Sequence, residues 1–343
     1  MRYAFLLVSC LLTHLFVLSN AAMPGIWQTG FGGRFLPLIA ADSNNYGKIQ
    51  MQSEQVLIDL YNGFSVVKGT YYMYNSQDTA VEMFTGYPQH GDYKQDMVKY
   101  IIIGDAPFNL KVLVNGKEVP CAAYNDSTIA ANSLSTTTVP VVSGSRNYQT
   151  WFLWKMKFAP KKITTITVYF LTNNSKAKLT HGYSRSTGHA FGYVLESGKA
   201  WAGNIDTGNI FIRLMDGITL KNIAGILPDS TIREANGKLV FSFINKDPSP
   251  SDNLLIWYNK EMDSIAFHQN VLPKTNIYFD AINKFPLCDF ENSKTWKTIS
   301  LTDFEPKDSG IGKFFIALLV GGVLLASLVI WLVVKVVIRA LKK

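Results

Sequence analysis

Apolar and polar residues alternate along much of the chain between residues 48 and 258, and this period of two predicts β-strands. In the first such run Val56, Ile58 and Leu60 fall on one face. The Asn62-Gly63 pair behind it, followed by an aromatic and β-branched run at 64–75, predicts a hairpin. Other strand-like runs lie at 79–87, 97–103, 110–119, 150–158, 163–171, 210–214, 238–244 and 254–258.

The body of the chain is therefore predicted to be mainly β, with a β-sandwich architecture, because many short strands are separated by turns. A Ser-, Thr- and Asn-rich stretch at 125–147 is either a junction between two domains or one long connection. We favour the junction. It predicts two sandwich-like halves, a first β-sandwich domain at 48–124 and a second β-rich domain at 148–299, after an extended, Gly- and Pro-rich lead-in at 23–47.

One C-terminal transmembrane helix is predicted over residues 313–335, because residues 314–334 are 21 residues without a charge and would span about 30 Å as a helix. A polar stalk at 300–312 precedes it. Four basic residues follow, which predicts a cytoplasmic tail at 336–343: they are Lys335, Arg339, Lys342 and Lys343. The alternative is a buried core helix, which is rarely this long without a charged residue.

Small residues four apart within the predicted span offer a surface for helix–helix association, because they let two backbones approach. The pairs are Ala317 with Gly321 and Gly322 with Ala326. The alternative is that Gly and Ala are simply common in membrane spans.

The N-terminal residues 1–22 have a basic start, an apolar run and small residues at Ala21 and Ala22, which is typical of a signal peptide. A cleaved signal followed by one span predicts a single-pass protein with its N-terminus outside. Its ectodomain is expected to be periplasmic or extracellular, attached to the cell envelope membrane.

Removing Arg2 and the four basic residues of the tail lowers the net charge from +8 to +3, so the ectodomain has no electrostatic footprint for nucleic acid. Cys121 and Cys288 remain outside the signal peptide. Two cysteines in an oxidising compartment predict one disulfide, and the alternative is two buried free thiols. Two distant cysteines are too few ligands for zinc.

Three stretches resemble a known family. They are 49–54 (IQMQSE) with Asn75 and Gly86-Tyr87-Pro88, then 151–160 running on to Tyr169, and 193–205 with its SG and WAGNI motifs. Together they resemble an uncharacterised family of exported, β-rich bacterial envelope proteins, known only as a domain of unknown function. The resemblance covers roughly residues 48–260 and does not extend to the lead-in. It implies an envelope location and supplies no catalytic residue.

No catalytic residue, metal site or cofactor site is predicted. The histidines outside the signal peptide do not have a metal-ligand spacing, and the chain has no Gly-x-Ser-x-Gly elbow. Paired carboxylates cannot be recognised from sequence, because their separation in space is not encoded locally.

The segment 181–204 is the candidate binding site, because it is glycine-rich and has the least strand-like pattern of the second half. Its candidate contact residues are Tyr183, Arg185, His189 and Trp201. The alternative is a structural crossing between sheets with Trp201 in the core.

We therefore expect a non-catalytic, membrane-anchored binding or structural module of the cell envelope, whose partner is an envelope protein or a glycan. One alternative is a carbohydrate-active or other hydrolase with a site built from loops. A second is an accessory subunit of a membrane complex.

Overall fold

The computed structural model describes residues 25–27, 35–37, 45, 47–88, 91–95, 100–104, 107–124, 151–175, 177–181, 184–193, 195, 198, 201–228, 232–249, 252–258, 265–287, 296–299, 319–321, 327, 331, 334 and 335. These residues are mainly in strands, as the alternation of apolar and polar positions predicted.

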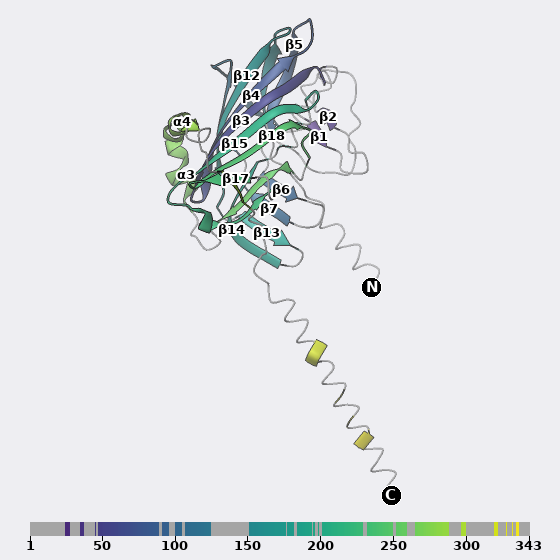
Figure 1. Cartoon of the computed structure of the whole chain (residues 1–343), viewed down its shortest axis with the longest axis vertical. Helices are drawn as coiled ribbons and strands as arrows, with labels where there is room; N and C mark the ends of the chain where they lie inside the picture. The colour runs from purple at the N-terminus through teal and green to yellow at the C-terminus, as the bar shows by residue number, and fades with distance from the viewer. Residues whose placement is uncertain are drawn as a thin grey trace.

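The centre of the molecule is a nine-stranded sheet (Figure 1). Its strands, in spatial order, are β20 (Lys297–Thr298), β17 (Ile232–Ala235), β18 (Lys238–Lys246), β15 (Ile205–Leu214), β3 (Ile49–Tyr61), β4 (Phe64–Asn75), β12 (Ile163–Asn173), β8 (Phe108–Val114) and β9 (Lys117–Val119). All neighbours are antiparallel except β15 and β3, which are parallel. The hairpin predicted at Asn62-Gly63 joins β3 to β4, with Gly63 at φ +82.

Two smaller sheets pack on one face of this central sheet. The six-stranded one contains β16 (Ile223–Leu227), β19 (Leu254–Tyr258), β14 (Ser184–Tyr193), β13 (Ala177–His181), β7 (Tyr100–Gly104) and β6 (Gly91–Gln95). The three-stranded one contains β10 (Ala122–Tyr124), β11 (Trp151–Phe158) and β5 (Val81–Pro88). Side chains from all three sheets form one continuous core, in which alternate residues such as Val56, Ile58 and Leu60 of β3 are buried.

The opposite, outer face of the central sheet carries a second core under a short helical cap. The cap consists of α3 (Phe267–Asn270), η5 (Leu272–Lys274) and α4 (Thr275–Asn283). Phe279 and Ile282 of α4 pack there with Leu57 of β3 and Phe211 of β15. Because apolar side chains on both faces are covered, the middle of the central sheet is enclosed between two layers.

The predicted division at 125–147 does not separate two sandwiches. β3 and β4, from the predicted first domain, lie between β15 and β12, from the predicted second domain, and hydrogen-bond to both. Strand pairing joins segments distant in sequence, so a polar linker does not by itself mark a domain boundary. Within the predicted lead-in, β1 (Gly25–Trp27) and β2 (Phe35–Pro37) pair antiparallel.

Among the described residues no helix has the length and apolar character needed to cross a membrane. The predicted signal peptide 1–22, the stalk 300–312 and most of the predicted span 313–335 lie outside the described residues, as does the tail 336–343. Of the small residues proposed for helix association, the structure describes Gly321.

Cys121 is a free, half-buried cysteine whose Sγ lies 3.7 Å from the carbonyl oxygen of Leu110. The predicted Cys121–Cys288 disulfide is therefore not seen, and Cys288 itself lies outside the described residues.

Candidate functional site

The most unusual titratable group in the core is Glu54 of β3. The pairing register of β3 with β4 shifts between Met51 and Ser53, just before Glu54. Glu54 therefore lies on the same face of β3 as Val56, which packs in the first core. Glu54 is 2% exposed, and in the described part of the chain neither carboxylate oxygen has a hydrogen-bond partner. Burial raises the pKa of Glu54 to about 8, because an ionised carboxylate loses its hydration there.

Glu54 lies beside Tyr71 of β4, its register partner, and beside Gly208 of β15. The hydroxyl of Tyr71 lies 3.0 Å from that of Tyr193 on β14, so a hydrogen bond joins the central sheet to the facing sheet. Position 208 accommodates only glycine in this packing, because a Cβ atom there would overlap the ring of Phe243. Tyr71 and Gly208 thus flank Glu54 on the two neighbouring strands.

The hydroxyls of Tyr87 and Tyr193 also lie in this part of the core. Burial holds the pKa of both tyrosines well above the usual value, and Tyr71 and Glu54 add to the effect. On the three-stranded sheet the register neighbours Thr85 and Trp154 each bury a polar atom, Oγ1 and Nε1, that has no hydrogen-bond partner among the described residues. The arrangement holds a neutral carboxylic acid at neutral pH inside an enclosed aromatic core.

Sequence reasoning did not select Glu54 as a candidate. The signal was present, since a glutamate stands at the position where the alternation of β3 calls for an apolar residue. Such a pattern does not reveal whether the carboxylate has a partner, because the candidate partners lie on other strands.

A second buried polar group centres on Asn174. Its amide donates to Ser65 Oγ and to the hydroxyl of Tyr258, 3.0 Å away, and its Oδ1 accepts from Thr172. The Tyr258 hydroxyl in turn donates to the carbonyl of Tyr61 at 2.9 Å. This chain of hydrogen bonds links β3, β4, β12 and β19, so it stabilises the packing of the two layers.

His189, one of the predicted contact residues, lies beside this group. It is on β14, 1% exposed, with its ring centroid 5.5 Å from that of Tyr258. Neither ring nitrogen has a hydrogen-bond partner within the residues that the structure describes, and burial lowers the pKa of the imidazole. His189 is therefore a neutral core histidine and is not on the surface.

The other predicted contact residues are dispersed. Ser184–Tyr193 is a strand, although its sequence looked least strand-like, and Arg185 pairs there with Thr180. The side chain of Arg185 and the whole of Tyr183 lie outside the described residues. Trp201 is 5% exposed and packs edge-on against Phe158 at 6.4 Å between ring centroids.

Replacing Trp201 by alanine is expected to destabilise the protein by about 3–5 kcal/mol, because truncating a buried large aromatic side chain leaves a cavity. Urea unfolding of the wild type and the variant measures this. The exposed neighbour Gly203 lies in the same turn, and Gly203→Asn serves as the control because asparagine tolerates its φ of +65. A Trp201 variant as stable as the control would contradict the core assignment.

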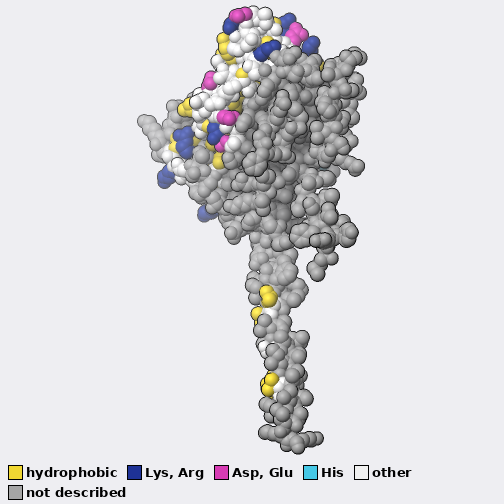
Figure 2. Space-filling view, turned by 90° about the vertical axis from the view of Figure 1, so that its right-hand side faces the viewer, with side chains coloured by type: hydrophobic (Ala, Val, Ile, Leu, Met, Phe, Trp, Pro, Cys, Tyr) yellow, Lys and Arg dark blue, Asp and Glu magenta, His cyan; other side chains and the backbone are white. Residues whose placement is uncertain are grey.

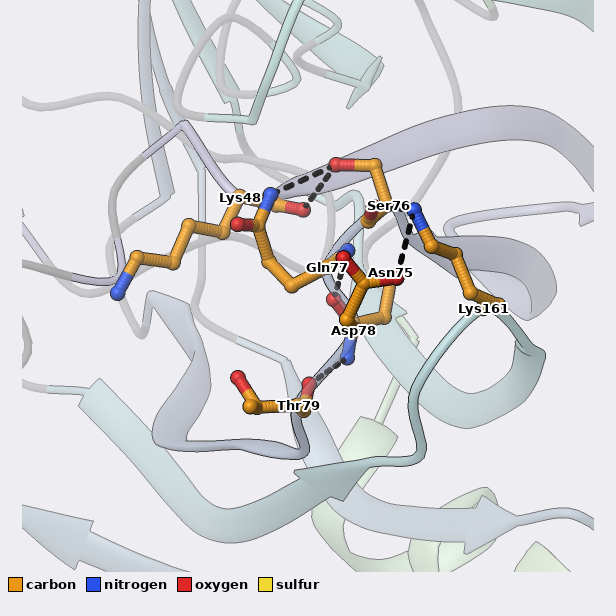
Figure 3. A network of polar contacts seen from close by, with 7 residues as sticks. All are labelled: Lys48, Asn75, Ser76, Gln77, Asp78, Thr79 and Lys161. Atoms are coloured by element: carbon orange, nitrogen blue, oxygen red, sulfur yellow. Dashed lines mark hydrogen bonds and ion pairs between the residues drawn. The ribbon is translucent and has the colours of Figure 1, made fainter.

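The polar network at one end of the molecule has a structural role (Figure 3). Lys161, in the β11–β12 turn, donates to the carbonyl of Ser76 at 2.7 Å and lies 3.4 Å from the carboxylate of Asp78. Ser76 Oγ donates to the carbonyl of Lys48 at 3.3 Å. Asn75 donates to the carbonyls of Thr79 and Phe158. Figure 2 shows charged side chains gathered at this end, and the network joins three connections there.

One buried ion pair stabilises the outer face of the central sheet. Arg213 of β15 donates from Nε and Nη2 to the two carboxylate oxygens of Asp59 on β3, at 2.8 and 2.6 Å. Asp59 is inaccessible, and the guanidinium lies 5.1 Å from the ring centroid of Phe285. Burial raises the pKa of Asp59 although Arg213 opposes the shift.

No group of three or more His, Cys, Asp and Glu side chains within the described ranges could hold a metal ion.

No family model matches the chain, and no curated protein matches it. Among solved structures, it is similar to a Legionella pneumophila protein named a "putative nutrient binding protein", at 17% identity and a TM-score of 0.39 over 62% of this chain and 67% of that one. It is also similar to an M1 zinc metallopeptidase from Deinococcus radiodurans, at 8% identity and a TM-score of 0.28 over 62% of this chain. The chain spans 43% of that peptidase. Both likenesses are too distant to support an argument about function.

Proposed function

We propose that this protein is a membrane-anchored, extracytoplasmic β-rich module that binds a partner through its surface and does not catalyse a reaction. The observation that carries the proposal is the enclosure of Glu54 and His189, which are 2% and 1% exposed. A general acid or base must come within hydrogen-bond reach of a substrate, and these two groups are covered by both layers of the fold.

A hydrolase is the alternative reading, because a carboxylic acid with a raised pKa is a common mark of an active site. The cause of the shift at Glu54 is burial, and no second carboxylate contributes to it. Glycoside hydrolysis needs two carboxyl groups facing one sugar from opposite sides of a cleft. Glu54 is enclosed by tyrosines and faces no such cleft in the described part of the chain, so it supports a structural role.

Membrane anchoring rests on the uncharged residues 314–334 and the basic residues that follow them. A cysteine placed at Ser309, in a chain whose native cysteines are replaced, is expected to react with a membrane-impermeant thiol reagent on intact cells or spheroplasts. A cysteine placed at Ala340 is expected to react after the membrane is permeabilised. The two positions lie on either side of the same predicted span, so each is the control for the other, and the reverse pattern would contradict the orientation.

A further inference from the structure

The outer face of the central sheet changes character along its strands. Where the helical cap covers it, a row of side chains across neighbouring strands is largely apolar and includes Leu57, Phe211 and Val240. Side chains on one face of a strand recur every second residue, so the next outward row lies two residues nearer the end that carries Lys161. In that row and the one after it the outward side chains are polar, apart from Ile244.

Two polar rows cross the same five strands, β18, β15, β3, β4 and β12, which lie side by side in Figure 1. The row next to the cap consists of register neighbours that are all half-buried: Ser242, Asn209, Gln55, Thr70 and Thr167. The next row consists of register neighbours that are half-buried or exposed: Ile244, Thr207, Ser53, Tyr72 and Thr165. We call these ten side chains the two-row face.

The ten side chains of the two-row face are uncharged, and at its edge Arg233 of β17 donates to one of them, Ser242 Oγ, at 3.3 Å. None of its side chains is a carboxylate, an amine, a guanidinium or an imidazole, and nine of the ten bear a hydroxyl or an amide. One hydrogen bond joins two of these side chains: Ser242 Oγ donates to Asn209 Oδ1 at 2.7 Å. Its large apolar or aromatic residues, Ile244 and Tyr72, are 81% and 38% exposed. Neighbouring strands are about 4.8 Å apart, so donors and acceptors recur at that spacing across the sheet.

We propose that the two-row face binds an uncharged polysaccharide, with the chain lying across the five strands. Hydroxyl and amide groups can donate to and accept from the hydroxyls of a sugar, and they offer no opposite charge to repay the desolvation of an ionic ligand. The ring of Tyr72 provides an amphipathic surface for a sugar ring. This inference rests on the proposed function of surface binding and names the class of partner.

A protein partner fits the face less well. The centre of a protein–protein interface is typically apolar, with aromatic residues and Arg enriched, whereas the centre of the two-row face is Gln55 and Thr70. Pairing with an added strand is also excluded there, because the central strands already pair on both sides. The side chains are therefore the groups available for recognition.

The test is isothermal titration of the full-length protein, held in a detergent without a sugar headgroup, with cellohexaose, chitohexaose and an oligogalacturonate. The neutral oligosaccharides are expected to bind and the anionic one is not. Gln55→Ala combined with Thr70→Ala is expected to raise the Kd about tenfold or more, because several hydrogen bonds are lost together. Thr207→Ala, at a more exposed position, is expected to weaken binding with an unchanged melting temperature.

The matched control is Asn270→Ala, which removes an exposed amide from the end of α3, outside the face. It is expected to leave the Kd unchanged. Absence of binding to both neutral oligosaccharides, equal binding by the Thr207 variant, or preference for the anionic oligosaccharide would each overturn the proposal. Thiol labelling of the Ser309→Cys variant tests the membrane topology without any sugar ligand. A failed glycan assay can therefore be distinguished from a wrong membrane topology.

Discussion

Replacing Glu54 by glutamine is expected to make the protein more stable at pH 9 and to change its stability little at pH 4.5. The folded protein raises the pKa of Glu54 from 4.5 to about 8. Each pKa unit corresponds to about 1.4 kcal/mol, so the largest expected difference is on the order of 5 kcal/mol. Glutamine has nearly the same shape and never ionises, so it removes the cost of a buried charge.

The direction follows from proton binding. Between pH 4.5 and about 8 the folded protein keeps a proton on Glu54 that the unfolded chain releases. Stability from this group is therefore fully present below pH 4.5 and is lost as the pH rises to about 8. Above that pH the wild type holds a buried carboxylate without a hydrogen-bond partner.

Urea unfolding of the wild type and the Glu54→Gln variant at several pH values measures the effect. The matched control is Glu118→Gln, since Glu118 is on β9 with its side chain 65% exposed and is paired with Lys111 at 3.3 Å. The control replaces an exposed member of a surface ion pair, so its effect on stability is expected to stay below about 1 kcal/mol. A Glu54→Gln difference that stays flat with pH would show that Glu54 is accessible to water.

Removing Arg213 is expected to destabilise the protein by about 4 kcal/mol, because Asp59 would keep a buried charge without its partner. Replacing both residues by apolar ones, Asp59→Leu with Arg213→Met, is expected to restore most of the loss, since a buried ion pair contributes little net stability over an apolar pair. The double-mutant cycle, from urea unfolding of the wild type, both single variants and the double variant, measures the coupling.

The exposed pair Lys111–Glu118 is the control for this cycle. Its side chains are 41% and 65% exposed, so Lys111→Ala is expected to cost less than about 1 kcal/mol. The loss in Arg213→Met should also grow as the pH rises above the ordinary value of 3.8, because burial raises the pKa of Asp59 and the unpaired carboxylate is more costly to bury once it ionises. Equal losses for Lys111→Ala and Arg213→Met would contradict the account of a buried pair.

Local patterns along the chain were enough to predict many of the strands, although they predicted neither β14 nor the helical cap. The turn at Asn62-Gly63 has the residues that a tight hairpin requires, and the runs on either side alternate with the period of a strand. The same alternation identifies which side chains of β3 face the first core. These features depend on neighbours in sequence, so the sequence by itself determined them.

Which strands meet was decided by the tertiary structure. β15 pairs in parallel with β3 although about 150 residues separate them, and no local pattern specifies that partner. The burial of His189, a candidate surface contact, and of Trp201, for which a core position was the alternative, follows from the layers that pack over them. The ionisation of Glu54 depends on rings from other strands, and the two-row face exists only because five strands place their polar residues in register. The physical reason is that burial and register are properties of neighbours in space, and the sequence lists only neighbours along the chain.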